Sequence, residues 1–448
     1  RDQPKDTQNA GNLPGVSAIY SIKSDSWDFT DKNELATDDN PVAAFTRLNV
    51  GKIPLTEAEL VRALFLRSAS LEDNGNRLSL QIAYEWDQIE KRLQNDAFWY
   101  FLQNQETGNP SRISLIFRLA ALKMGKSVNG EDYGVFFHFA ELLKSSVSAE
   151  DEWQKVKNIF MALEEWYEDR ALFHILGFIF HQKGGSLTEI MELLTDGLNL
   201  GKEAFGQNLR SRVYRLVLDQ DFEATTPEEV RAEISNLCQT ISYRNRKKVR
   251  SLLLLFNLAT LLEDPRSNIR FQFESFKCES WDIEHIRSVS DNRPDQPAAQ
   301  EEWLRHCLKF LRSSNNKTEQ RLADRIVTFL DPETQPENQI TFEEIDGEIL
   351  SFFKEAQEAP DNDLANLTLL DSRTNRGYRN AVFAVKRDIL LKHDRSGIFV
   401  PLCTRNVFLK CYSHAAGNSM FWMKEDAQDY IDAIEETLTS FFIGSGAE

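Results

Sequence analysis

The hydrophobic positions between residues 80 and 240 recur with the period of an α-helix. Segments such as LSLQIAYEWDQIEKRL, EDEWQKVKNIFMALEEWYED and TPEEVRAEISNLCQTI carry apolar residues at i, i+3 and i+4 spacings. Short clusters of Gly, Asn and Asp separate these segments, and no fixed repeat length recurs. The pattern therefore predicts an antiparallel array of helices rather than a solenoid.

An earlier helix is predicted from a start signal near residue 56. Thr56 can cap this helix, and Glu59 stands three residues further on, which is the spacing of a capping box. The apolar stripe expected on the helix consists of Leu60, Ala63, Leu64 and Leu66.

Near residue 241 the pattern changes to short strands and shorter helices. Strands are predicted at 270–273, 281–286, 367–370 and 398–400, and helical segments at 298–356, 375–392 and 424–442. The predicted fold class is mainly α: a helical N-terminal and middle region is followed by an α+β domain that carries helical insertions. We expect boundaries that divide the chain into residues 1–66, 67–245 and 246–448.

The composition is that of a folded chain, because 41% of the residues are hydrophobic and 30 are Phe, which excludes a disordered protein. No apolar run approaches the roughly 18–20 residues that span a bilayer, and the polar first residues carry no secretory signal. Five Cys without a CxxC pair argue against a disulfide framework or a structural zinc site. We therefore expect a cytoplasmic protein that has no membrane contact. Because residue 1 is Arg, we also expect further residues upstream.

The formal net charge is −18, from 70 acidic and 52 basic residues, which disfavours indiscriminate coating of nucleic acid. Two segments depart from this balance. YRNRKKVR (residues 243–250) holds five Lys or Arg and no acid, and residues 366–414 hold nine Lys or Arg against three Asp. Basic surfaces of this kind can bind a phosphate backbone, although a solvated helix face gives the same pattern.

One of the seven His residues lies next to a carboxylate in a predicted strand. His285 follows Glu284 at the end of the segment 281–286, where a strand-end turn can direct both side chains to one site. A second segment has Asn366 at the start of a strand and Asn375 at the start of a helix. Strand, strand and helix in this order are typical of the ββα-metal arrangement of HNH nucleases. Carboxylate and amide oxygens suit Mg²⁺, which also keeps water and substrate phosphate as ligands.

The segments WDIEHI and NLTLLDSRTNRGYRNAVFAVK resemble the HNH domain at the C-terminus of GmrSD-type, modification-dependent restriction proteins. The string FTRLNVGKIPLTEAELVRALFL resembles the end of that family's ParB/sulfiredoxin-like, nucleotide-hydrolysing domain. The resemblance implies that residues 1–66 are the remnant of this first domain, and that 246–448 form an HNH nuclease domain with helical insertions. The family's DGQQR-type nucleotide motif does not occur in the chain, so nucleotide hydrolysis by this chain is not expected.

The resemblance also implies roles for four residues. Glu284 and Asn375 match the ligands of a Mg²⁺ ion, with Mn²⁺ as the alternative metal, and His285 matches the general base that activates water. Asn366 matches the amide that orients this base. An imidazole with a pKa near its ordinary 6.5 accepts a proton at neutral pH. The alternative is that Glu284 ends a strand, His285 lies at the surface and both Asn residues serve turns.

Double-stranded DNA, including modified phage DNA, is the partner that the resemblance implies, together with a second copy of the chain or another subunit of a defence system. The side chains expected to contact DNA are Lys248, Arg250, Arg376, Arg379, Lys386 and Arg387.

Three functional hypotheses remain open from the sequence. The first is a metal-dependent HNH endonuclease that cuts or nicks DNA in prokaryotic defence against phage, in the manner of type IV restriction. The second is a helical subunit that binds DNA or protein without cutting. The third is a nucleotide-regulated switch within a longer parent chain. A metal titration separates the first two hypotheses, and nucleotide binding tests the third.

Overall fold

The computed structural model describes residues 55–72, 74–105, 111–126, 133–144, 147–222, 226–279, 281–287, 294, 296–312, 316–331, 340–353, 362–372, 374, 381–414 and 420–444. Helices dominate this part of the chain, which confirms the mainly α prediction. Within it, two short strands pair into a two-stranded sheet.

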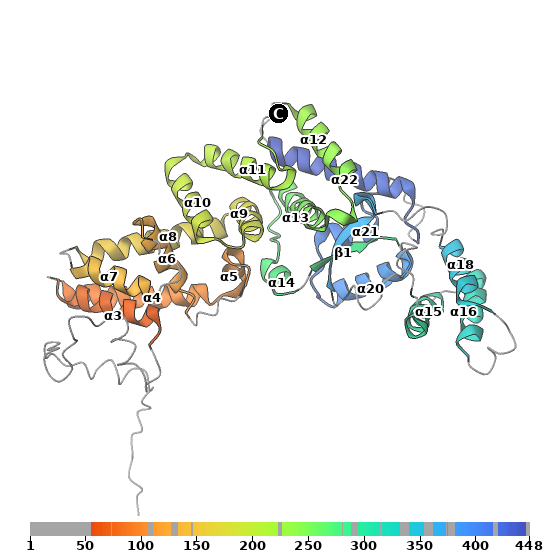
Figure 1. The fold of residues 1–448 in the computed structure, drawn as a ribbon, viewed down its shortest axis with the longest axis horizontal. Helices are drawn as coiled ribbons and strands as arrows, with labels where there is room; N and C mark the ends of the chain where they lie inside the picture. Colours follow the sequence, from red (N-terminus) through yellow and green to blue (C-terminus); the bar gives the residue numbers. More distant parts are fainter. Residues whose placement is uncertain are drawn as a thin grey trace, which may run out of the picture.

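The N-terminal half is an array of helices, drawn from orange to light green in Figure 1. Its helices are α3 (Glu57–Ser70), α4 (Gly75–Leu93), α5 (Asp96–Leu102), α6 (Ser114–Lys123), α7 (Gly134–Lys144), α8 (Ala149–Glu168), α9 (Arg170–Lys183), α10 (Leu187–Asn199), α11 (Lys202–Leu218) and α12 (Pro227–Thr240). Helix α3 packs against α4 and α7, α6 packs against α8, and α9 packs against α8 and α11. Aromatic rings fill the core, where Phe65 contacts Phe117, Phe139 and Trp153.

Helix α3 begins where the sequence predicts. The Glu59 N–H donates to the Thr56 hydroxyl at 3.3 Å, and the Thr56 N–H donates to the Glu59 carboxylate at 2.7 Å, which confirms the capping box. The predicted stripe was partly wrong, because Ala63 is exposed. The buried residues of α3 are Ala58, Leu60, Val61, Phe65 and Ala69. These positions keep the i+3/i+4 spacing that turns one face toward α4 and α7, so residues 57–66 pack as part of the helical array.

The C-terminal half surrounds a central helix, α13 (Arg246–Glu263), in which every residue from Ser251 to Ala259 is buried. The other elements are η1 (Tyr243–Asn245), α14 (Phe273–Cys278), β1 (Trp281–His285), α15 (Pro297–Leu311), α16 (Lys317–Leu330), α18 (Phe342–Phe352), η3 (Leu364–Asn366), β2 (Leu367–Asp371), α20 (Phe383–Arg395), α21 (Leu402–Leu409) and α22 (Lys424–Ile443). Helix α13 contacts α9, both strands, α21 and α22. Helix α12 also packs along α22. The expected boundary at residue 245 therefore falls between α12 and α13, which both contact α22.

Strand β1 pairs with β2 in antiparallel register, with Glu284 opposite Thr368 and His285 opposite Leu367. The strands predicted at 281–286 and 367–370 are therefore confirmed. The strand predicted at 270–273 was wrong, because Phe273 begins helix α14. The Phe273 ring packs so closely on α9 that a Cβ at Gly177 would lie 2.3 Å from it. The segment is therefore held by the packing of this ring on a helix and not by pairing with another strand.

The strand predicted at 398–400 was also wrong, since the segment has no regular secondary structure. Its central residue, Phe399, instead packs its ring against Trp281 and Phe271 at centroid distances of 5.5 and 5.4 Å. A segment with β-type residues can therefore bury its apolar side chain by packing, even where it has no neighbouring strand to pair with.

Helices α15, α16 and α18 are inserted between β1 and β2 and lie at the opposite end of the molecule from α3, α4 and α7 (Figure 1). Helix α15 contacts α20, which joins this insertion to the sheet region. In the part of the chain that the structure describes, no helix has the combination of length and apolar character that crossing a membrane requires.

Candidate functional site

The end of β1 and the start of β2 bring three of the predicted site residues together. Strand β1 ends at His285, and Asn366 immediately precedes β2. The two residues are close because the strands pair in antiparallel register, which sets the end of β1 beside the start of β2. The Ile286 N–H donates to the Asn366 carbonyl at 2.8 Å, and the Arg287 N–H donates to Asn366 Oδ1 at 2.9 Å. Asn366 therefore fixes the turn after His285 through both its backbone and its side chain.

Glu284 lies on the interior side of this strand end and forms an ion pair. Its carboxylate is 2.6 Å from Lys386 Nζ, and the two side chains are only 6% and 1% exposed. Lys386, in the first turn of α20, also donates to the His285 carbonyl at 2.5 Å. Burial raises the pKa of the Glu284 carboxyl, and the Lys386 ammonium acts against this shift. The pair is thus a buried unit in which each charge compensates the other.

This position of Lys386 differs from the surface position that a DNA contact requires. Its ammonium is occupied by Glu284 and the His285 carbonyl, and its stem is enclosed in the core, so the structure gives it an internal role. Among the other expected DNA contacts, Lys248 pairs with Asp219 at 2.8 Å, and Arg387 Nε donates to the Phe408 carbonyl at 2.8 Å.

Arg250 is exposed in the second turn of α13. Arg376 and Arg379 lie outside the described residues.

The His285 imidazole is 7% exposed and is contacted by two segments that are distant in sequence. Its Nε2 lies 3.1 Å from Asn362 Oδ1, an oxygen that only accepts, so the imidazole N–H donates. The Tyr243 ring lies on the imidazole with a centroid distance of 4.6 Å and an interplanar angle of 41°. The Tyr243 N–H also donates to the Asn362 carbonyl at 2.8 Å, so these two residues are joined to each other.

Arg246 ties this group to β1. Its guanidinium contacts the Asp282 carboxylate and the Tyr243 hydroxyl, and its Cζ lies 4.7 Å from the Tyr243 ring centroid. The sequence marked the basic segment around Arg246 but gave no sign that Tyr243 packs on His285. Asn362 carries no local signal at all, since nothing in its neighbourhood distinguishes it from a turn residue.

The end of β1 holds a positive charge between oxygen atoms, namely the ammonium group of Lys386. It lies between a Glu284 carboxylate oxygen and the His285 carbonyl oxygen, and oxygen donors are what a hard divalent cation prefers. Asn375, the other expected ligand, lies outside the described residues. Within the described ranges, no three His, Cys, Asp or Glu side chains converge on a position for a metal ion. Glu284 is the expected metal ligand that the structure describes, and its carboxylate is paired with Lys386.

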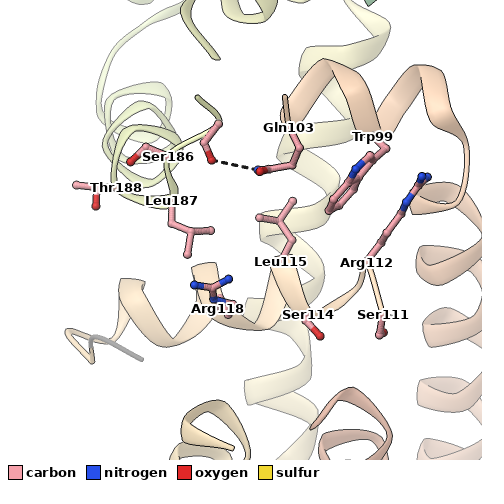
Figure 2. A pocket seen from close by; sticks show the side chains of 11 residues that line it. Trp99, Gln103, Ser111, Arg112, Ser114, Leu115, Arg118, Ser186, Leu187 and Thr188 are labelled. Carbon is pink, nitrogen blue, oxygen red and sulfur yellow. Dashed lines mark hydrogen bonds between the residues drawn. The ribbon is translucent and has the colours of Figure 1, made fainter. Parts of the chain in front are cut away.

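Two cavities lie away from these residues. One, of about 310 Å³, lies between α5, α6 and the start of α10, where Trp99, Arg118 and Ser186 line it (Figure 2). The other, of about 540 Å³, lies between α15 and α20 at the opposite end of β2, where Asp371 and His393 are among its lining residues. Neither cavity is lined by Glu284 or His285, so neither extends the candidate site.

Comparison of the chain with known proteins found no match to a protein-family model, to a curated protein or to a solved structure.

Proposed function

We propose that the protein is a metal-dependent endonuclease of the HNH type that cleaves or nicks double-stranded DNA. The observation that carries this proposal is the meeting of Glu284, His285 and Asn366 at one end of a two-stranded sheet, with helix α20 following the second strand. This is the strand–strand–helix order that the resemblance to GmrSD-type restriction proteins led us to expect. The residues come from two segments about 80 positions apart, so their meeting is a property of the fold.

In the proposed reaction, His285 accepts a proton from the water whose oxygen attacks the scissile phosphorus. The P–O bond to the leaving sugar oxygen breaks as the new P–O bond forms, and the leaving oxygen takes a proton from water. A positioned general base contributes roughly 10²–10⁴-fold to such a reaction, provided that its orientation is held. Asn366 holds the turn that follows His285 through two hydrogen bonds. A Mg²⁺ or Mn²⁺ ion held by Glu284 and Asn375 would supply charge stabilisation at the phosphate.

The charge beside the site supports a nucleic-acid substrate. Tyr243, whose ring contacts His285, is the first residue of the basic segment 243–250, in which Arg244, Lys247 and Arg250 are exposed. Exposed Lys and Arg supply the phosphate contacts on which DNA affinity depends. Modified phage DNA, a role in type IV-like restriction, a cytoplasmic location and a partner subunit are proposed from the family resemblance, because fold and site chemistry do not select among cellular roles.

A second candidate function is a DNA-binding subunit that does not cut. It is favoured by the Lys386 ammonium, which neutralises the one carboxylate that the described part of the site offers to a metal. This candidate predicts DNA binding without cleavage, and no divalent-cation binding that depends on Glu284 and Asn375. For the third hypothesis, a nucleotide-regulated switch in a longer parent chain, we identify no supporting site among the described residues.

The deciding experiment is plasmid cleavage with Mg²⁺ or Mn²⁺ by the wild-type chain and by His285→Ala. His414→Ala is the matched control, since this His is exposed and pairs with Asp429. We expect nicking by the wild type and by the control, and a loss of about 10²–10⁴-fold in His285→Ala. Undiminished cleavage by His285→Ala would remove the mechanism. A wild type that binds DNA and leaves it intact in both metals would favour the second candidate.

A further inference from the structure

Two side chains outside the predicted motif make direct contact with the His285 imidazole. Asn362 Oδ1 lies 3.1 Å from His285 Nε2, and the Tyr243 ring centroid lies 4.6 Å from that of the imidazole. The first contact is a hydrogen bond at the edge of the imidazole, and the second is a tilted ring–ring contact with an interplanar angle of 41°. The ring contact bears on the rotation of the imidazole, and the hydrogen bond bears on which nitrogen carries the proton.

Asn362 selects one tautomer of the imidazole. Its Oδ1 can only accept a hydrogen bond, so the neutral imidazole that donates to it carries its proton on Nε2. The hydrogen bond made by one ring nitrogen decides which nitrogen carries the proton in a His side chain. Removing the acceptor takes away this contribution to the preference for the Nε2-protonated form.

Tyr243 and Asn362 are placed by a second, small backbone contact beside the sheet. Ser242 and Asp363 form an isolated antiparallel bridge, and the Tyr243 N–H donates to the Asn362 carbonyl at 2.8 Å. Arg246 then holds Tyr243 in place through its contacts with the Tyr243 hydroxyl and with Asp282 of β1. The two residues therefore reach His285 as one preassembled unit.

We infer that Asn362 and Tyr243 are positioning residues for His285, which hold the imidazole in one tautomer and one orientation for proton transfer. The inference rests on the proposed function, because positioning has a catalytic consequence only if His285 acts as the base. It nevertheless has a consequence for the resting protein, namely a single Nε2-protonated tautomer. Activity and tautomer can be measured separately, so the inference and the proposed function can fail separately.

The kinetic test compares paired variants of the whole chain on plasmid DNA. Asn362→Leu removes the acceptor at nearly constant volume, whereas Asn362→Asp keeps an acceptor oxygen. We expect Asn362→Leu to lower kcat by about tenfold to a hundredfold, by analogy with the partners that orient a metal-binding His. KM for DNA should stay nearly constant, and Asn362→Asp should recover a large part of kcat. Tyr243→Leu should lower kcat, and Tyr243→Phe, which keeps the ring, should lower it less.

The second test reads the tautomer directly by NMR of protein labelled with ¹⁵N-histidine, with the His285 signals identified by their loss in His285→Ala. At one fixed pH, the wild type should show a protonated Nε2 and an unprotonated Nδ1. Asn362→Leu should show averaging between tautomers, while its thermal melting remains cooperative. If Asn362→Leu keeps either the wild-type kcat, in a wild type that cuts, or the wild-type ¹⁵N pattern, the inference is overturned.

If the wild type cuts no DNA, the proposed function fails, and the ¹⁵N pattern alone then decides whether Asn362 sets the tautomer. If the wild type cuts and only His285→Ala is inactive, the proposed function stands and the positioning role is rejected.

Discussion

Glu284 and Lys386 form an ion pair that is almost completely withdrawn from solvent, with 2.6 Å between the carboxylate oxygen and Nζ. Glu284 is the residue before the last one of β1, and Lys386 lies in the first turn of α20, so the pair links the two elements that the ββα arrangement requires to be close. Lys386 adds a hydrogen bond to the His285 carbonyl, which fixes the same strand end from a second direction.

Breaking this pair from one side should destabilise the protein strongly. Lys386→Met leaves the Glu284 carboxylate buried without a counter-charge, and such a change costs about 3–5 kcal/mol. The double variant Glu284→Gln/Lys386→Met should recover part of this loss, because no buried charge then remains. Urea unfolding of the four proteins measures the coupling. Additive effects of the two single substitutions would contradict a coupled pair.

Divalent-cation binding should depend on the carboxylate of Glu284. We expect Mn²⁺ titration, followed by electron paramagnetic resonance of free Mn²⁺, to show weaker binding for Glu284→Gln and for Asn375→Ala. Glu274→Gln, on helix α14, is the control substitution and should bind as the wild type does. Equal Mn²⁺ affinity in all four proteins would show that the cation is held elsewhere, or that the site does not bind one.

The basic segment after Tyr243 should contribute to DNA binding in proportion to the exposure of its charges. Arg250 is exposed, whereas Lys248 is partly buried and paired with Asp219 at 2.8 Å. We therefore expect Arg250→Ala to reduce the slope of log K against log salt by about 0.9, the value for one lost phosphate contact. Lys248→Ala should change it less. Fluorescence anisotropy with a DNA duplex at several salt concentrations provides the slopes, and a larger effect from Lys248→Ala would contradict this assignment.

The fold should lose stability on mild acidification because of a buried His. His174 is fully buried, its Nδ1 donates to the Arg170 carbonyl at 2.7 Å, and its Nε2 accepts from the Phe271 N–H at 3.0 Å. Burial lowers the pKa of His174 to about 4, so the folded protein keeps it neutral where the unfolded chain, near pKa 6.5, already binds a proton. The stabilisation is fully present above pH 6.5 and is lost as pH falls toward 4.

From the 1.36 kcal/mol that each pKa unit represents, the loss amounts to at most about 3 kcal/mol. Urea unfolding at a series of pH values between 7 and 4.5 measures it, and His174→Gln should flatten the pH dependence. Part of the slope should remain in this variant, because burial also lowers the pKa of His181, to about 3. An unchanged slope in His174→Gln would show that His174 is not its source.

Much of the local structure could be predicted because its causes are local. The capping box at Thr56 and Glu59 is formed within four residues, and the segments 281–286 and 367–370 have the alternation and the β-type residues of strands. The sequence also suggested that Glu284, His285 and Asn366 belong to one site, and the register of β1 and β2 brings them together. The predictions at 270–273 and 398–400 failed because a strand needs a partner, and partners are distant in sequence.

The sequence by itself determined that this chain is mainly helical, where most helices lie, and which strand ends carry a carboxylate, an imidazole and an amide. Asn257 shows where that information stops. As a polar residue in an apolar run it was visible in the sequence, but only the folded chain directs its Nδ2 to the Leu253 carbonyl and its Oδ1 to the Cys403 N–H.

The tertiary structure likewise decided that Lys386 turns inward to Glu284, and that Asn362 and Tyr243 reach His285. The physical reason is that helix periodicity and capping act over a few residues. The partner of a buried charge or of a buried imidazole is instead whichever polar group the packing of distant segments brings within hydrogen-bonding distance.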